Sequence, residues 1–386
     1  MTSIRNGGRG KDGNACASQM IYLSPVPWSS YAQRPHHFVR WYHKRFGGCV
    51  YWLEPYGTRL PNFGDLRRNS QMVLESNACP PWLQRIPVSA VPVEPLPGVR
   101  AVNLVLWQDI LSRLGKISGK TDTLVVIGKP SRLALAVLEN LSHCPSLYDA
   151  MDDFPQFYAG LSRRVMAYHE RQVLSRVHHV WVSSSWLGIR VSGVRTEAEL
   201  VMNGLDVSTF PSPEARPMIT GARVFGYVGA IGKWFDWQWL IELARYRPDD
   251  TIRLIGPRHT SVPRKLPDNV ELLPPCDHSV AVQRMQEFDV GLIPFRRTEL
   301  TRSVDPIKYY EYRALGLPVL STGFGEIPHH ALDDPGVVIV DRREQLPLAL
   351  ERICNHQDSA SRILRFRRQN DWGSRFDSAR FIRCVW

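Results

Sequence analysis

A lysine and a glutamate stand three residues apart in a segment whose other residues mark the two ends of a helix. Asp305 suits the N-cap, Pro306 suits the first helical position and Gly316 suits the C-terminal stop. Lys308, in the first turn, is unfavourable against the helix dipole unless an anion lies in front of it. Glu311 lies on the same face and suits ribose hydroxyls. The pattern predicts a nucleotide-diphosphate site; the alternative is a surface Lys–Glu pair on an ordinary helix.

A second candidate phosphate site opens the second half of the chain. Residues 225–236 read as a strand, a glycine-bearing turn and a helix. Gly229 and Gly232 would let the backbone approach a phosphate, and Lys233 would neutralise it. We expect Lys233 and Lys308 to converge on one diphosphate and to stabilise it as a leaving group without a metal ion. The alternative is a plain turn between a strand and a helix.

The loop after the first predicted strand carries aromatic and basic side chains. Arg34 opens the helix predicted at residues 34–46 and is expected to reach the diphosphate from the opposite half of the protein. Trp28 and Tyr31 are expected to form an aromatic stacking surface.

Apolar strands alternate with amphipathic helical stretches along the chain, which is typical of parallel α/β sheets. The predicted parts are a disordered tail at 1–18, a Rossmann-like domain at 19–203, a second Rossmann-like domain at 204–368 and a C-terminal helix at 369–386. The polar, Pro-rich stretch 54–97 receives no element. Two doubly wound domains would face a central cleft, where such sheets bind ligands at strand carboxyl ends.

The 386-residue chain has a formal net charge of +11, which calls for an acidic partner. Candidates are nucleotide diphosphates, anionic lipid head groups and nucleic acid. Because the basic residues are spread along the chain, an anionic membrane surface is favoured over nucleic acid. No apolar run reaches the roughly 18 residues that span a bilayer. The seven cysteines are scattered without a C-x-x-C pair, which argues against a zinc site or a disulfide framework and indicates a reducing, cytoplasmic compartment.

The stretch 305–322 resembles the nucleotide-sugar signature of GT-B glycosyltransferases, particularly the family-4 and family-1 types that build bacterial exopolysaccharide, lipopolysaccharide and teichuronic acid. In those families the donor is contacted by a run with the pattern Pro-x-Lys-x-x-Glu-Tyr-x-Ala-x-Gly-x-Pro-Val. Glu311 matches the second glutamate of their usual E-x7-E pair, whereas Ser303 stands at the position of the first. The stereochemical outcome is therefore not predicted.

The resemblance implies a metal-independent enzyme without a cofactor, which moves a sugar from a UDP- or GDP-sugar to a saccharide or lipid-linked acceptor in cell-surface polysaccharide biosynthesis. Such an enzyme is expected in the cytoplasm, at the inner face of an anionic membrane, and not on nucleic acid. An inverting relative places an aspartate base after the strand that corresponds to residues 146–150, a position that Asp152 matches. Asp153 is expected to face the acceptor, and the alternative is that both acids cap the next helix.

The resemblance also implies a role for each domain. The domain at 19–203 would bind the acceptor, with Trp28 and Tyr31 stacking on an acceptor sugar, and the domain at 204–368 would bind the nucleotide-sugar donor. The helix at 369–386 would cross back to the first domain.

Two further functions stay open at this point. One is a nucleotide-sugar epimerase built on the same paired domains. The other is a non-catalytic basic protein attached to a membrane or to nucleic acid, which would not need the ordered signature at 305–322.

Overall fold

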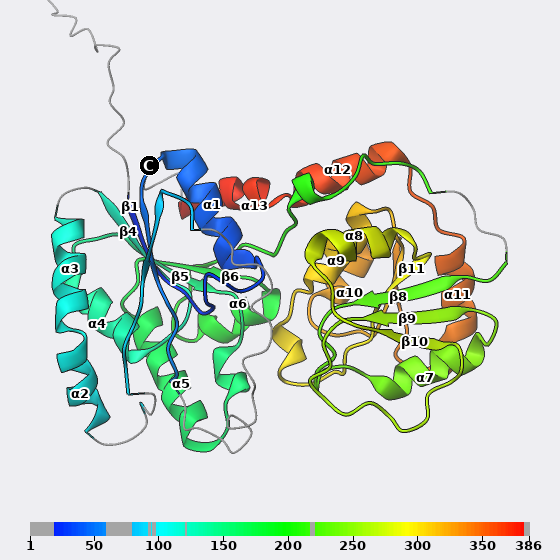
Figure 1. The fold of residues 1–386 in the computed structure, drawn as a ribbon, viewed down its shortest axis with the longest axis horizontal. Helices are drawn as coiled ribbons and strands as arrows, with labels where there is room; N and C mark the ends of the chain where they lie inside the picture. Colours follow the sequence, from blue (N-terminus) through cyan, green and yellow to red (C-terminus); the bar gives the residue numbers. More distant parts are fainter. Residues whose placement is uncertain are drawn as a thin grey trace, which may run out of the picture.

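The structure is a computed structural model that describes residues 19–58, 79–91, 94, 98–119, 122–216 and 221–381. The predicted tail at 1–18 and the last part of the predicted C-terminal helix, 382–386, lie outside the described residues. The described chain folds into two parallel β-sheets, each with its own helices, which lie side by side in Figure 1. We call them the N-terminal half and the C-terminal half. This is the predicted α/β class with two Rossmann-like units.

The N-terminal half is built on a seven-stranded sheet with the order β3-β2-β1-β4-β5-β6-β7, in which every pairing is parallel. Its strands are β1 (Gln19–Leu23), β2 (Val50–Leu53), β3 (Leu83–Ile86), β4 (Thr123–Ile127), β5 (Ser146–Ala150), β6 (His179–Val182) and β7 (Ala198–Leu200). Its helices are α1 (Arg34–Phe46), α2 (Val99–Leu106), α3 (Gln108–Ser118), α4 (Arg132–Asn140), α5 (Gly160–Leu174) and α6 (Ser185–Ser192).

The C-terminal half repeats this plan with six parallel strands in the order β10-β9-β8-β11-β12-β13. Its strands are β8 (Val224–Val228), β9 (Thr251–Ile255), β10 (Val270–Leu273), β11 (Val290–Ile293), β12 (Val319–Ser321) and β13 (Val337–Ile339). Its helices are α7 (Trp237–Tyr246), α8 (His278–Gln286), α9 (Ile307–Ala314), α10 (Ile327–Asp333) and α11 (Leu346–Cys354). In each sheet the strand order reverses once, between β1 and β4 and between β8 and β11. Such switch points open a crevice at the strand carboxyl ends.

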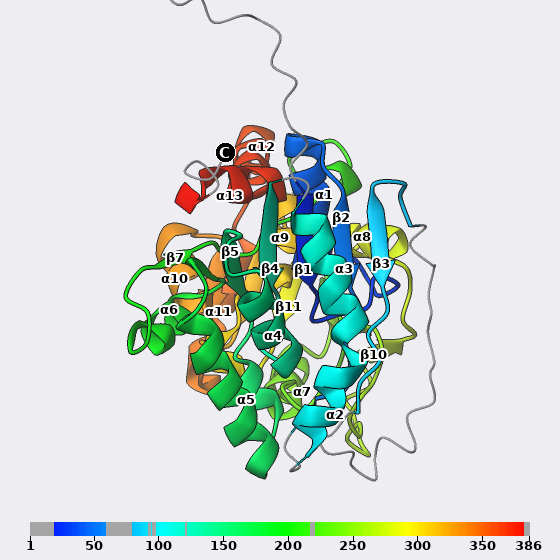
Figure 2. The same ribbon diagram turned by 90° about the vertical axis from the view of Figure 1, so that its left-hand side faces the viewer.

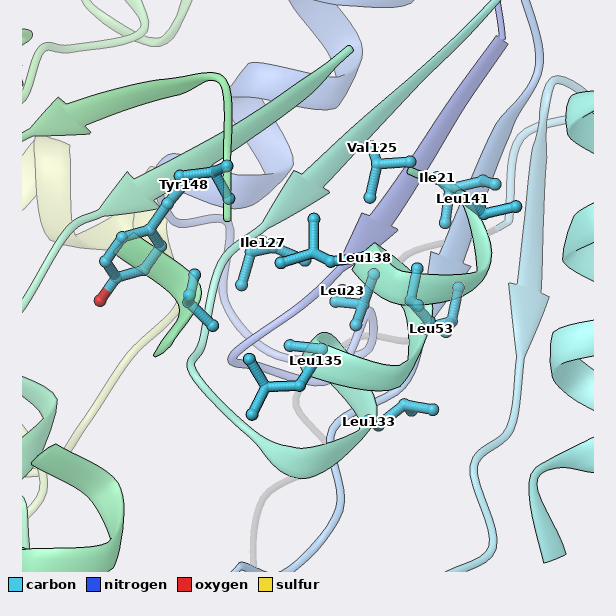
Figure 3. Close-up of a cluster of buried hydrophobic side chains, with 14 of the residues drawn as sticks. Ile21, Leu23, Leu53, Val125, Ile127, Leu133, Leu135, Leu138, Leu141 and Tyr148 are labelled. Carbon is cyan, nitrogen blue, oxygen red and sulfur yellow. The ribbon is translucent and has the colours of Figure 1, made fainter. Parts of the chain in front are cut away.

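Both faces of the first sheet are buried, which explains why its strands are almost continuously apolar. In β1, Ile21 and Leu23 face one layer of helices, whereas Met20 and Tyr22 face the other. Figure 3 shows the first of these layers, in which α4 lays Leu138 and its neighbouring leucines over the strands. Because both faces of the sheet are buried, the positions of the strand ends are fixed. The loops that follow the strand ends and carry the polar side chains are held in place as a result.

The end of the chain returns to the N-terminal half. Helix α12 (Ala360–Asn370) packs on α9, and α13 (Trp372–Ser378) packs on α1, so that the two helices bridge the halves along one edge (Figure 1 and, from the side, Figure 2). Trp372 and Phe376 are 5% and 0% exposed and lie in the core beneath α1. They anchor the predicted C-terminal helix in the N-terminal half.

Some elements differ from the prediction. Strand β3 lies within the unassigned stretch 54–97, where two of its four residues are exposed and its apolar pattern is correspondingly weak. The segment that follows β3 forms two helices, because Trp107 ends α2 and begins α3. The Trp107 ring is fully buried, and its Nε1 donates to the Ser89 carbonyl at 3.1 Å. Helices α6 and α10 were not predicted.

Candidate active site

A cavity of about 730 Å³ lies between the two halves, at the carboxyl edge of the second sheet. The ends of β8 and β9 line it together with the first turns of α8 and α9. The start of α1 and the first residue of α13 line it from the N-terminal half. The position is the one expected for a ligand in a doubly wound sheet, and the volume falls within the roughly 300–1,000 Å³ of small-molecule sites.

Lys308, Glu311 and His278 form a charged group in the cavity wall. The Lys308 ammonium donates to one oxygen of Glu311, and the other oxygen lies 3.1 Å from Nε2 of His278. Burial raises the pKa of Glu311, but the charges of Lys308 and His278 outweigh it and lower that pKa to about 2. Glu311 is therefore an anion that can accept ligand hydroxyls. Lys308 and Glu311 lie where the sequence predicts; His278 was missed, because it comes from a different helix.

Gly229 holds the end of β8 against Lys308. Its φ is +153°, and a Cβ atom there would lie 2.9 Å from the Tyr227 hydroxyl and 3.4 Å from Cε of Lys308. The next strand approaches equally closely, since a Cβ atom on Gly256, whose φ is +146°, would lie 2.1 Å from the Gly229 carbonyl oxygen. Only glycine fits both positions. Bare backbone therefore meets a lysine at the start of a helix, an arrangement that suits a phosphate.

The opposing wall carries His37 and Arg40, neither of which was predicted as a site residue. The ring of His37 stacks on Trp372 with centroids 5.2 Å apart, and burial, with Arg40 and His278 nearby, lowers its pKa to about 4. The guanidinium of Arg40 lies 5.5 Å over the Trp28 ring, and no described residue is hydrogen-bonded or ion-paired to it. The three-residue spacing of His37 and Arg40 on α1 is the signal that could have revealed this face.

Tyr31 also lines the cavity, where it is 49% exposed and can offer its ring to a ligand, as predicted from the sequence. The matching prediction for Trp28 is wrong. Its side chain is 1% exposed and packs edge-on against Trp52, with ring centroids 5.2 Å apart. A tryptophan enclosed in this way belongs to the core and cannot stack on an acceptor sugar.

Arg34 does not reach the cavity, so its predicted contact with donor phosphates is wrong. Its side chain is 1% exposed and pairs with Asp149 at the end of β5, with Nη2 and Oδ1 2.8 Å apart. A second nitrogen donates to the Val201 carbonyl at 2.7 Å. Arg34 therefore ties α1 to the sheet and to the segment that leads into the second half.

The two candidate acids after β5 have different surroundings, and neither lines the cavity. The pKa of Asp152 is raised to about 7, mainly by burial. The charge of Arg34 lowers this pKa, and the charge of Asp153 raises it. This value suits a general base, which stays a prediction for Asp152. Asp153 is 3% exposed and lies 3.5 Å from the guanidinium of Arg190. Its predicted contact with the acceptor is therefore wrong.

Asp305 joins the two halves instead of facing the donor. Helix α9 begins one residue later than predicted, with Pro306 as its N-cap. The Asp305 carboxylate accepts hydrogen bonds from the Asn203 backbone N–H at 2.8 Å, the Tyr310 hydroxyl at 2.8 Å and the His330 ring at 2.9 Å. With its side chain buried and fully bonded, it cannot bind a donor, and that prediction is wrong. Ile307 and Lys308 at the start of α9 line the cavity, whereas Pro306, another predicted donor-binding residue, is not among the lining residues.

Gly232 and Lys233 also lie apart from the cavity lining. A Cβ atom on Gly232 would lie 2.5 Å from the Trp234 ring, so this glycine makes room for a tryptophan that does line the cavity. The Lys233 side chain is exposed. The expected convergence of Lys233 with Lys308 is therefore not seen, because the turn is occupied by the Trp234 ring.

Taken together, two Rossmann-like halves enclose a cavity that one half lines with Lys308, Glu311 and His278 and the other with Arg40 and His37. This is the GT-B architecture, in which two α/β units face each other across a cleft. Among the described residues, no group of three His, Cys, Asp or Glu side chains is placed to hold a metal ion.

The comparison with known sequences gives one partial relative. A stretch of 198 residues is 26% identical to TuaH of Bacillus subtilis (strain 168), assigned as a glycosyltransferase of teichuronic acid biosynthesis. The match takes in 46% of this chain and 50% of TuaH, so it spans about half the length of that relative. No family model matches the chain.

Solved structures extend the likeness to the whole fold. The lipopolysaccharide outer core galactosyltransferase WaaB superposes with a TM-score of 0.62 at 12% identity, over 95% of this chain and 99% of WaaB. HepE of Anabaena in complex with UDP-glucose superposes with a TM-score of 0.59 at 13% identity, over 95% of this chain and 100% of HepE. These likenesses confirm the GT-B fold and the resemblance that the sequence indicated. No helix in the described ranges is both long and apolar enough to span a bilayer.

Proposed function

We propose that this protein is a glycosyltransferase that takes a sugar from a nucleotide-diphosphate donor and transfers it to a saccharide or lipid-linked acceptor. The single observation that carries the proposal is the cluster of Lys308, Glu311 and Gly229 in one cavity wall. Lys308 and the start of α9 would hold the diphosphate, and Glu311 would accept from the ribose hydroxyls. HepE binds UDP-glucose, which favours uridine over guanosine as the base.

The residues would have separate roles in the reaction. Charge develops on the diphosphate as its bond to the sugar breaks, and Lys308 with the helix N-terminus would stabilise it, with Arg40 approaching from the other half. We propose that no metal ion is needed for this step, because these cations are supplied by the protein. Asp152, whose pKa is raised to about 7, would take the proton of the attacking hydroxyl when the cleft closes over the donor.

A thermal-shift panel tests the donor class. UDP, UDP-sugars, GDP and GDP-sugars are compared at equal concentration, with and without EDTA. We expect UDP compounds to raise the melting temperature most, equally in both buffers, because a ligand that binds only the folded state stabilises it. If no nucleotide raises the melting temperature, the proposal fails. If donor sugars interconvert without an acceptor, the epimerase alternative replaces it.

The proposed setting is cell-surface polysaccharide biosynthesis at an anionic membrane. TuaH is assigned to teichuronic acid biosynthesis and WaaB to the lipopolysaccharide outer core, and the net charge of +11 suits an anionic surface. Incubation of the protein with radiolabelled UDP-sugar and a bacterial membrane extract tests this setting. Label that moves into the lipid fraction supports a lipid-linked acceptor, and label that moves only into soluble saccharide excludes one.

A further inference from the structure

Helix α2 turns aliphatic side chains away from the protein. Val102, Val105 and Leu106 are 49%, 64% and 46% exposed, respectively. Residues spaced three and four apart share one face of a helix, and in a globular protein such a stripe normally faces the core. Asn103 is instead the only fully buried residue of α2. The stripe therefore has no partner among the described residues.

Helix α5 carries a second apolar stripe next to the first. Leu161 is 51% exposed and Tyr168 is 47% exposed, with half-buried Val165 between them at helical spacing. The exposed Arg164 borders this stripe. Figures 1 and 2 show α2 and α5 reaching the same end of the N-terminal half, with α4 between them.

A pocket of about 250 Å³ lies at the seam between these two helices. Arg100 of α2 and Arg132 of α4 line it, and in the part of the chain that the structure describes neither guanidinium is hydrogen-bonded or ion-paired. His169 is 5% exposed and also lines it, and no hydrogen bond reaches its Nδ1, which lies 3.4 Å from the Glu94 carboxylate. Arg100 and Arg132 therefore bring two positive charges to a pocket that Glu94 also lines, and guanidinium groups are suited to binding a phosphate.

We infer that the seam of α2 and α5 is the surface on which this protein sits on an anionic bilayer, with a lipid phosphate between Arg100 and Arg132. Aliphatic side chains bordered by arginines are the composition of surfaces that lie at a membrane interface. Arginine also occurs at protein–protein interfaces, but two guanidinium groups in the pocket beside the stripes and the net charge of +11 suit an anionic surface. Each arginine near such a surface contributes about 1 kcal/mol.

The inferred surface is connected to the carboxyl edge of the first sheet. Glu94 of the pocket accepts a hydrogen bond of 2.5 Å from Tyr56, which lines a crevice at the ends of β1 and β2 together with Lys129. A phosphate at the seam would thus lie next to the switch point between β1 and β4. The inference rests on the proposed function, because it names the surface that would meet the membrane carrying a lipid-linked acceptor.

Vesicle flotation tests the inference. The full chain is mixed at low salt with vesicles of phosphatidylcholine and phosphatidylglycerol, or with vesicles of phosphatidylcholine alone. We expect flotation with the anionic vesicles only. Arg100→Ala combined with Arg132→Ala should weaken the binding by on the order of 10-fold or more, from about 1 kcal/mol for each charge. Val105→Asp should weaken it similarly, because it places a charge in the aliphatic stripe.

Matched variants in the C-terminal half provide the control. Arg342→Ala combined with Arg343→Ala removes two exposed charges, and Leu348→Asp places a charge on a leucine that is 73% exposed. Neither should change flotation. All substituted side chains are exposed or line the pocket, and unchanged melting temperatures show that each variant folds. The affinity for UDP, measured in solution, should be unchanged in every variant.

Three results would overturn the inference. The first is equal flotation of wild type, Arg100→Ala/Arg132→Ala and Val105→Asp. The second is binding of soluble glycerol phosphate at the seam as tightly as vesicles, which makes it a site for a free phosphate ester. The third is self-association that Val105→Asp abolishes without any vesicle binding, which makes the stripe a protein interface. UDP affinity is measured separately from flotation. If flotation contradicts the inference, the proposed donor site is unaffected. If UDP does not bind, only the proposed function is contradicted.

Discussion

Lys308 lies directly beside Gly229, so closely that a Cβ atom on the glycine would be 3.4 Å from Cε of the lysine. The contact joins the end of β8 to the first turn of α9 at the cavity wall. A diphosphate at this point would meet backbone and ammonium together. The proposed binding of the donor diphosphate depends on this contact.

Gly229→Ala should therefore impair donor binding. The new methyl group would press on the Tyr227 hydroxyl, 2.9 Å away, and on Lys308, in a backbone conformation with φ of +153° that alanine rarely adopts. We expect UDP affinity, measured by calorimetry, to fall by about 10-fold or more, since hydrogen bonds to charged groups contribute roughly 1.5–3 kcal/mol. Gly47→Ala is the control, with φ of +76° and no atom within 4 Å. It should lower the melting temperature without changing UDP affinity; a loss of affinity equal to that of Gly229→Ala would contradict the account.

Arg40 is expected to supply donor binding from the N-terminal half. It lines the cavity, and no described residue is hydrogen-bonded or ion-paired to it. Arg40→Met keeps the apolar stem and removes the charge, so UDP affinity should fall by roughly 10-fold through lost charge-assisted hydrogen bonds. Lys44→Met removes an exposed charge from the same helix and should have no effect. Equal affinities for the two variants would show that the N-terminal half does not touch the diphosphate.

Arg34 should affect stability and not donor affinity. Its ion pair with Asp149 is buried, with the two side chains 1% and 0% exposed. Arg34→Met would leave the carboxylate uncompensated, at a cost of about 3–5 kcal/mol in the free energy of unfolding. Denaturant unfolding measures this loss, which Arg34→Met combined with Asp149→Leu should partly restore. An unchanged free energy of unfolding together with weakened UDP binding would show that Arg34 contributes to the donor site.

The raised pKa of Asp152 predicts that both activity and stability depend on pH. Its folded pKa of about 7 lies above the ordinary value of 3.8, so ionisation costs folding free energy. This cost is absent below pH 3.8, grows as the pH rises and is complete above about 7. Asp152→Asn should therefore raise the melting temperature more at pH 8 than at pH 5.

The same pKa governs the proposed base. Below about pH 7 the wild-type kcat/KM should fall tenfold per unit, because the base is then protonated, and above it the value should level off. Asp152→Asn should lose transfer by about 10²-fold or more and lose this pH dependence. A variant with full activity, or a wild-type profile that is flat between pH 5 and 8, would remove Asp152 from the mechanism.

The paired α/β sheets could be predicted from the sequence because buried parallel strands are continuous apolar runs, as at Thr123–Ile127 and Val290–Ile293. Lys308 and Glu311 could be predicted because they lie three residues apart on one helix. His278 could not, because the β10–α8 connection brings it to Glu311 from 33 residues away.

Two of the mistaken predictions share one physical cause. Arg34 and Trp28 have side chains that suit a site, but both lie within the core of the N-terminal half, where they are 1% exposed. Residue type and position in a loop do not decide which way a side chain turns. Tyr31, from the same loop, does reach the cavity.

Calorimetric titration of UDP into Lys308→Ala and Lys233→Ala tests the central claim most directly. Lys308 lines the cavity and Lys233 is exposed outside it, so the two variants remove the same charge at different places. We expect Lys308→Ala to weaken UDP binding by about 10-fold or more and to slow transfer by on the order of 10²-fold, with Lys233→Ala within about twofold of wild type. Wild-type affinity and turnover in Lys308→Ala would contradict the account of the donor site.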